Sequence, residues 1–287
     1  MRWRPSFQLL FVCLLSGLWG CGSPERQPVA DRLSVFVTIP PQAEFVERVG
    51  GTRVQVNIMV PVGAEPHTHE PAPQQLVLLE GAHLYARVGS GIAFERAWMD
   101  RIRAVNPGMH VVDCAAGIDL VEGDPHIWLS PLLARHMADR IREGLSRIDP
   151  EHAAHYRLGY EQYAADLAEL DAVIRRSLQE ANIRRFMVYH PAWGYFARDY
   201  GLEQLTVEHE GKEPTAQRLA RVVQAMQETR IGAVFVSPQF DQRSARALAA
   251  ETGAQVLSVD PLPRHYLQGM REFATALISS ERDSHDE

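Results

Sequence analysis

The sequence predicts an α/β protein of two lobes, each with a parallel β-sheet of about four strands flanked by helices, joined by one long helix. Two observations predict this class. Short β-branched runs alternate with segments of helical periodicity, which is typical of βαβ units and of the parallel sheets that they form. The alternation is interrupted once, at residues 150–181, by a long segment of helical periodicity.

The first half of the alternation, residues 33–149, is expected to form the N-terminal lobe. Residues 33–39 (LSVFVTI) and 54–60 have the character of strands, and residues 43–49 are expected to be a short helix that ends at Gly50-Gly51. The lobe then continues in the same way. Its remaining expected elements are strands at 83–88 and 110–113 and helices at 73–80, 94–105 and 131–148.

Residues 150–181 are expected to form the connecting helix. Gly159 is the one glycine of this segment, and apolar residues recur in it at helical spacing. A helix of about 30 residues is about 45 Å long, which exceeds the width of one lobe. Such a helix would tie the lobes together and limit their relative motion to a small tilt.

The C-terminal lobe, residues 182–287, is expected to repeat the alternation. Two α/β lobes that face each other place a ligand site in the cleft between the carboxyl ends of their strands. The expected elements are strands at 186–190, 203–207, 233–236 and 255–259, helices at 192–200, 215–230 and 243–252, and a closing helix that runs to about residue 279.

Composition narrows the classes of function. The chain is 46% hydrophobic, as in an ordinary globular protein, which rules out disorder and collagen-like repeats. It carries 29 Lys and Arg against 36 Asp and Glu, for a formal net charge of −7. This balance leaves no basic surplus for a phosphate backbone, so we expect no nucleic-acid partner.

The N-terminus is expected to be a signal peptide, residues 1–20. Two arginines precede an apolar run, residues 7–19, that is shorter than the roughly 20 residues needed to span a bilayer. Leu18-Trp19-Gly20-Cys21 resembles a lipobox, which implies lipid attachment to Cys21, a tether over residues 21–32 and an extracytoplasmic, membrane-anchored protein. The alternative is a plain signal peptide with an incidental cysteine.

Candidate metal ligands follow the ends of expected strands. Of the 12 histidines, His67, His126 and His190 each lie at or after the carboxyl end of a strand, and Asp260 closes the strand at 255–259. Imidazoles together with one carboxylate suit a divalent ion of borderline softness, and tetrahedral zinc is the first choice. Because these residues come from separate loops, they predict a metal site in the interlobe cleft.

The sequence segments around these residues resemble those of a known family, and the resemblance runs from about Leu33 to Leu277. They resemble the cluster A-I substrate-binding lipoproteins of zinc and manganese ABC transporters, with the segment at 124–131 as the most specific match. The matching segments are PVGAEPHTHEP (61–71), DPHIWLSP (124–131), YHPAWGYF (189–196), GKEPT (211–215) and VDPL (259–262).

The resemblance implies a function and a ligand set. His67 and His126 would be metal ligands of the N-terminal lobe, and His190 and Asp260 those of the C-terminal lobe. In the family, histidine at the position of His190 goes with zinc and glutamate with manganese, so we expect capture of Zn²⁺, with Mn²⁺ as the alternative. The protein would be a monomer, not an enzyme, that delivers the ion to an ABC permease and its ATPase for uptake.

Some residues depart from the family pattern. His69 stands where an aromatic residue is frequent, and it could be a spare ligand, a capture group or a surface histidine. Ser237 replaces a frequent glutamate, and His209 could capture metal at the cleft rim. The long histidine-rich loop of some zinc-specific members is missing, because few residues separate Asp113 from Asp124.

Two other functions compete with transport. An adhesin-type lipoprotein that binds metal would have the same sequence features. A zinc hydrolase needs an open water position and a general base, and the chain has no His-Glu-x-x-His motif.

The three histidines also predict a dependence on pH. Because histidine ligands bind metal only when neutral, we expect the metal affinity of the protein to fall as the pH drops through about 6.5.

Overall fold

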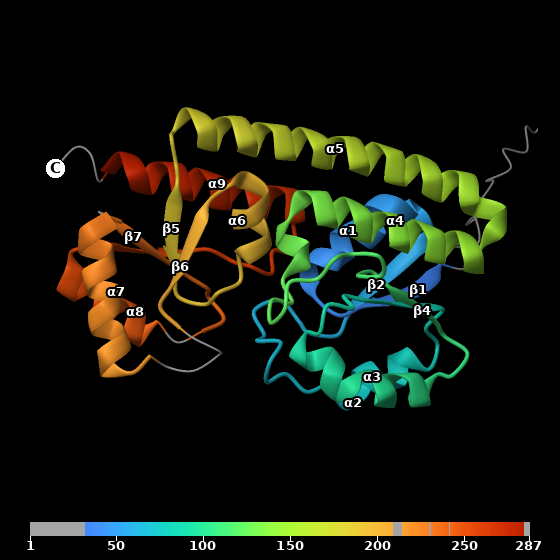
Figure 1. Ribbon diagram of the computed structural model, residues 1–287. Coiled ribbons are helices and arrows are strands. Elements are labelled where there is room, and N and C mark those ends of the chain that lie inside the picture. The colour runs from blue at the N-terminus through green and yellow to red at the C-terminus, as the bar shows by residue number, and fades with distance from the viewer. Residues whose placement is uncertain (1–31, 209–213, 230, 241, 284–287) are drawn as a thin grey trace, which may run out of the picture. The chain divides into compact units, whose positions relative to one another are not determined.

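The computed structural model describes residues 32–208, 214–229, 231–240 and 242–283 (Figure 1). Residues from Arg32 onward fall into one compact unit. The expected signal peptide, Cys21 and residues 21–31 of the expected tether lie outside the described residues.

The first sheet contains four parallel strands in the order β2-β1-β3-β4. Its central strand β1 is buried on both faces, because Val35 and Val37 pack with α1 and α4 whereas Phe36 packs on the opposite face with α2 and α3. The elements are β1 (Leu33–Val37), α1 (Pro40–Gly50), β2 (Val54–Ile58), α2 (Pro73–Leu79), β3 (Leu84–Arg87), α3 (Ala93–Val105), β4 (His110–Asp113) and α4 (Pro131–Ile148).

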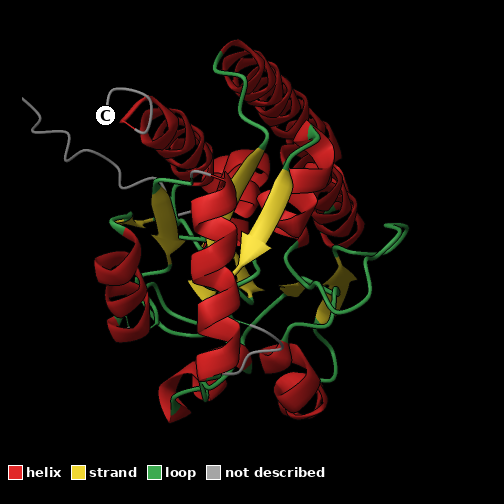
Figure 2. Cartoon of the chain, turned by 60° about the vertical axis from the view of Figure 1, so that its left-hand side comes forward, coloured by secondary structure: helices red, strands yellow, loops and turns green. Residues whose placement is uncertain are grey.

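The second sheet repeats this arrangement with the strand order β6-β5-β7-β8, again all parallel. Phe186 and Phe235 pack against Phe273 of α9, whereas Met187 and Val234 face the helices α7 and α8. Figure 2 shows helices on both sides of the strands. The elements are β5 (Arg185–Val188), α6 (Gly194–Tyr200), β6 (Glu203–Thr206), α7 (Ala216–Thr229), β7 (Ala233–Val236), α8 (Arg243–Thr252), β8 (Gln255–Ser258) and α9 (Tyr266–Asp283).

The long helix α5 (Ala153–Glu180) has 28 residues, or about 42 Å at 1.5 Å per residue. It lies along α1 and α4 of the first half and α9 of the second (Figure 1). Gly159 allows the close approach to α1, since a Cβ at this position would lie 2.5 Å from the Val49 carbonyl oxygen and 2.8 Å from that of Arg48. One buried stripe of α5 joins both halves in a continuous core: Tyr156, Tyr163, Leu167, Leu170, Ile174 and Leu178.

The predicted fold class is confirmed, with local differences. The helix expected at 43–49 begins earlier, at Pro40, because proline suits the first turn and the Gln42 side chain accepts hydrogen bonds from the backbone N–H groups of Thr38 and Ile39. A 3₁₀ turn, Ile127–Leu129, precedes α4 and was not expected. Among the described residues, no helix is both long and apolar enough to cross a bilayer.

Candidate metal site

A small cavity lies between the loops that follow the strands of the two sheets. Its volume of about 20 Å³ is enough for one ion or water molecule. The first half of the chain contributes Glu65, Pro66, His67, Ile92, His126 and Trp128, and the second half contributes His190, Ser237, Gln239, Phe240, Pro261 and Leu262.

Three of the four predicted ligands line this cavity together. The ring centroid of His190 lies 5.8 Å from that of His67 and 5.3 Å from that of His126. The ring planes of both pairs are steeply inclined, at 72° and 80°. Each histidine comes from a different loop, so the fold itself brings the imidazoles together.

His126 is oriented by Asp124, two residues earlier in the same loop. The Asp124 Oδ1 atom lies 2.8 Å from His126 Nδ1 and accepts a hydrogen bond from the His126 backbone N–H at 2.9 Å. An ionised carboxylate can only accept, so Nδ1 carries the proton and Nε2 is left with its lone pair for a metal. Burial lowers the pKa of His126, and the hydrogen bond to Asp124 opposes that shift.

His190 has a matching partner in Glu208. Its Nδ1 atom lies 3.0 Å from Glu208 Oε2, and both side chains are almost completely buried. Glu208 reaches this position because its backbone N–H donates to the Tyr189 carbonyl at 2.9 Å, beyond the last paired residues of β5 and β6. Two histidines at the cavity therefore each share Nδ1 with a carboxylate, an arrangement that fixes the ring orientation and leaves Nε2 for a metal.

His67 is the most accessible of the three, with 43% of its side chain exposed. Its loop is held by Glu65, which accepts hydrogen bonds from the His67 backbone N–H and the Thr68 hydroxyl, both at 2.8 Å. Burial lowers the pKa of His67, while the nearby Glu65 carboxylate opposes this shift and His190 adds to it. A neutral imidazole on a partly open loop is suited to meeting an incoming cation.

Asp260 lies next to the cavity but is not one of the described residues that line it. Its Oδ1 atom accepts hydrogen bonds from Gln239 Nε2 at 2.7 Å and from the Leu262 backbone N–H at 2.8 Å. Within the described residues, no three His, Cys, Asp or Glu side chains already stand at metal-binding spacing. The structure thus places three predicted ligands around one cavity and the fourth at its edge.

The residues that depart from the family pattern lie in different parts of the structure. Ser237 lines the cavity and donates a hydrogen bond to Gln239 Oε1. The His69 ring lies 6.0 Å from that of Phe94, and its buried Nε2 has no hydrogen-bond partner in the part of the chain described. His209 lies outside the described residues. Cys114 is a buried free thiol whose pKa is raised by burial.

Sequence reasoning missed the roles of Asp124 and Glu208. The Asp124 spacing in Asp-Pro-His was visible as a motif, but not as a hydrogen bond. No local signal links Glu208 to His190, because the pairing of β5 with β6 brings them together.

Comparisons with known proteins find relatives that are named for zinc uptake or metal binding. The relatives include the "High-affinity zinc uptake system protein ZnuA" of Bacillus subtilis (strain 168), 27% identical over 88% of this chain and 86% of the relative. A "Putative metal-binding protein" of Chlamydia muridarum (strain MoPn / Nigg) is 30% identical over 94% of this chain and 98% of its own length. The solved structure described as "Crystal structure of ZnuA" superposes with a TM-score of 0.85 at 38% identity, covering 88% of this chain and all of that one.

A family model matches most of the chain, residues 35–280. The match extends over both sheets, the long helix and every loop of the cavity. The chain therefore belongs to the family described as "Zinc-uptake complex component A periplasmic".

Proposed function

We propose that this chain is the extracytoplasmic metal-binding component of an ABC transporter, which captures Zn²⁺ and delivers it to the membrane permease for uptake. The observation that carries the proposal is the meeting of three imidazoles, from three loops and both sheets, around a cavity the size of one ion. Relatives named for zinc uptake and zinc binding support it.

The proposed ligands are His67, His126, His190 and Asp260. For His126 and His190 the free nitrogen is Nε2, because Nδ1 is shared with a carboxylate. Asp260 would bind through Oδ2, since Oδ1 already accepts two hydrogen bonds. A small movement of the loop at residues 260–262 or of the His67 loop would close the four donors around the ion.

Three nitrogen donors and one carboxylate favour zinc over manganese. Zinc is commonly bound in four-coordinate sites by imidazole and carboxylate, whereas manganese is suited to carboxylate, carbonyl and water ligands. Ser237 supplies a neutral hydroxyl at the cavity wall, where a glutamate would add a hard oxygen donor. The donor set therefore supports Zn²⁺ as the cargo and leaves Mn²⁺ as the weaker competitor.

The remaining features of the proposal concern the setting of the protein. The partners are the permease and its ATPase, the chain works as a monomer, and diacylglycerol on Cys21 anchors it to the membrane through residues 21–32. The lipobox-like sequence supports this anchoring.

Metal content tests the proposal. The chain from Gly22 onward, dialysed without chelator, should retain one zinc ion per molecule and should prefer zinc to manganese in competition titrations. Replacing His67, His126, His190 or Asp260 with alanine should abolish retention or weaken it greatly. His69→Ala is the matched control, because His69 belongs to the same loop as His67 but does not line the cavity. Equal losses in His69→Ala and His126→Ala would contradict the ligand assignment.

A further inference from the structure

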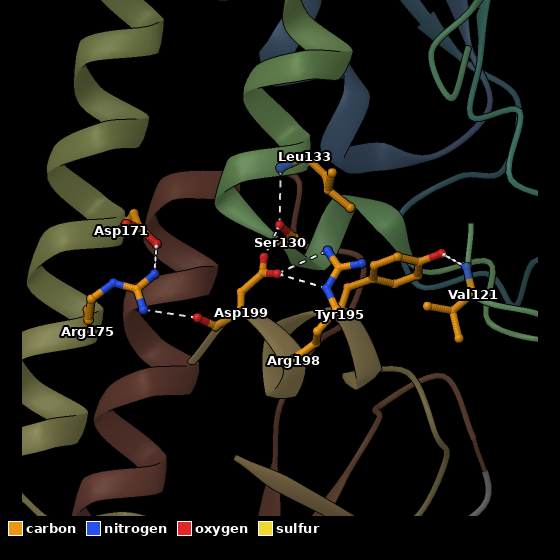
Figure 3. Close-up of polar contacts among 8 residues, drawn as sticks. All are labelled: Val121, Ser130, Leu133, Asp171, Arg175, Tyr195, Arg198 and Asp199. Atoms are coloured by element: carbon orange, nitrogen blue, oxygen red, sulfur yellow. Dashed lines mark hydrogen bonds and ion pairs between the residues drawn. The ribbon is translucent and has the colours of Figure 1, made fainter. Parts of the chain in front are cut away.

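A buried carboxylate, Asp199 in α6, joins the two halves of the molecule away from the proposed ligands. Its side chain is 7% exposed. One oxygen accepts a hydrogen bond from the Ser130 hydroxyl, and the other accepts from Arg198 Nε at 3.1 Å and from a terminal guanidinium nitrogen at 3.0 Å (Figure 3). Ser130 belongs to the first half of the chain and Asp199 to the second.

Ser130 is fully buried and is the N-cap of α4. Its hydroxyl oxygen accepts a hydrogen bond from the Leu133 backbone N–H at 3.1 Å while its proton is donated to Asp199. The Ser130 hydroxyl therefore both donates and accepts a hydrogen bond. Without the carboxylate, this buried donor would lose its partner, and the start of α4 would lose its fixed position against α6.

A short rigid segment connects Ser130 to the proposed ligand His126. The Leu129 backbone N–H donates to the His126 carbonyl at 3.1 Å, and that of Ser130 donates to the Ile127 carbonyl at 3.3 Å. In the same turn, the indole N–H of Trp128 donates to the Pro261 carbonyl at 2.7 Å. Because Ser130 and His126 belong to one hydrogen-bonded turn, a displacement of Ser130 would also move His126.

The other end of the contact leads back to His190. Helix α6, which carries Asp199, begins four residues after His190, and the Ala192 backbone N–H closes this turn on the His190 carbonyl at 2.8 Å. Arg175 of α5 fixes the C-terminal end of α6 by donating to the Asp199 carbonyl at 3.0 Å and to Asp171 at 3.1 Å (Figure 3).

We propose that Asp199 is a positioning residue for metal binding: by holding the N-cap of α4, its carboxylate sets His126 opposite His190 before the ion arrives. The inference rests on the proposed function and adds a residue that touches neither the metal nor its ligands. Asp199 thus assembles one half of the site in advance, and the partly exposed His67 completes it.

The test compares zinc dissociation constants, measured by competition with a chromogenic chelator, for variants of the chain from Gly22 onward. Asp199→Ala should raise the dissociation constant about tenfold, the lower end of the range for residues that orient metal ligands. Asp199→Asn keeps an acceptor for Ser130 and should recover most of the loss. Asp171→Ala is the matched control: it removes the carboxylate that Arg175 contacts, which has no contact with Ser130, and zinc affinity should not change.

A second comparison separates positioning from a general loosening of the fold. In a His126→Ala background, Asp199→Ala should cause no further loss of zinc affinity, because the residue through which it acts is already missing. An equal tenfold loss in that background would overturn the inference, as would an unchanged dissociation constant for Asp199→Ala alone.

A third comparison covers the possibility that Asp199→Ala does not fold, which circular dichroism would reveal. Ser130→Ala should then show the tenfold loss, and an unchanged value would overturn the inference. Failure of the parent chain to bind zinc would overturn the proposed function itself. Zinc binding by the parent with no response to either variant would overturn only the role of Asp199.

Discussion

Asp124→Ala tests whether carboxylates orient the proposed ligands. Asp124 Oδ1 holds His126 twice, at Nδ1 (2.8 Å) and at the backbone N–H (2.9 Å). Removing it frees the imidazole to rotate and to place its proton on Nε2, the nitrogen that a metal needs. Loss of such a partner typically weakens metal affinity 10–100-fold, or about 1.4–2.8 kcal/mol at about 1.4 kcal/mol per tenfold.

The assay is a zinc competition titration at pH 7.5, run beside thermal unfolding of the metal-free protein. Asp124→Asn retains an acceptor oxygen for both donors and should lose less affinity than Asp124→Ala. Asp119→Ala removes an exposed carboxylate of the same loop and serves as the control. The orienting role of Asp124 is contradicted if Asp124→Ala binds zinc as tightly as the parent, or if Asp119→Ala loses as much zinc affinity as Asp124→Ala.

The remaining predictions concern pH, packing and the buried thiol. Burial holds the pKa of His67 and His126 below the usual value of about 6.5, so both stay neutral in moderate acid and zinc affinity should begin to fall only below that pH. Without metal, the unfolded chain binds more protons than the folded chain at pH values between the lowered pKa values and about 6.5. The free energy of unfolding, measured in urea, should therefore decrease as the pH falls through this window. An unchanged free energy would contradict the burial of these imidazoles. Gly159→Ala should destabilise the fold by about 1–3 kcal/mol, because the new Cβ would lie 2.5 Å from a carbonyl oxygen of α1. This loss is expected although alanine is the better helix former by about 1 kcal/mol. Leu158→Ala, at an exposed neighbouring position, is the control and should change the urea midpoint little. In the folded chain from Gly22 onward, the buried Cys114 thiol should not react with a thiol reagent, and after unfolding one thiol per chain should react. Rapid reaction in the folded state would show that Cys114 is accessible to the reagent.

The sequence was sufficient to predict the architecture because parallel strands buried on both faces leave a clear signal. Strand β1 ends in the β-branched and aromatic run Val35-Phe36-Val37, and Val35 and Phe36 pack into separate cores on the two faces of the sheet. The apolar stripe of α5 has helical spacing over its whole length. Periodicity is less informative at element ends, where side chains such as Gln42 decide how far a helix extends.

The histidines of the site could be predicted because each follows a strand, and the ends of parallel strands meet at one edge of a sheet. The hydrogen bonds that organise the site could not. Glu208 reaches His190 through the pairing of β5 with β6, and Asp199 reaches Ser130 across 69 positions of sequence. Such contacts depend on how separate elements pack, and a single sequence carries no local record of that packing.

The most direct test of the proposed metal site is a crystal structure of the zinc-loaded chain with anomalous diffraction recorded on both sides of the zinc absorption edge. We predict one strong anomalous peak in the cavity, about 2.0–2.1 Å from Nε2 of His126 and of His190, with His67 and a single oxygen of Asp260 completing a tetrahedron. A zinc peak elsewhere on the chain, or one in the cavity bound through Nδ1 of these histidines, would contradict it.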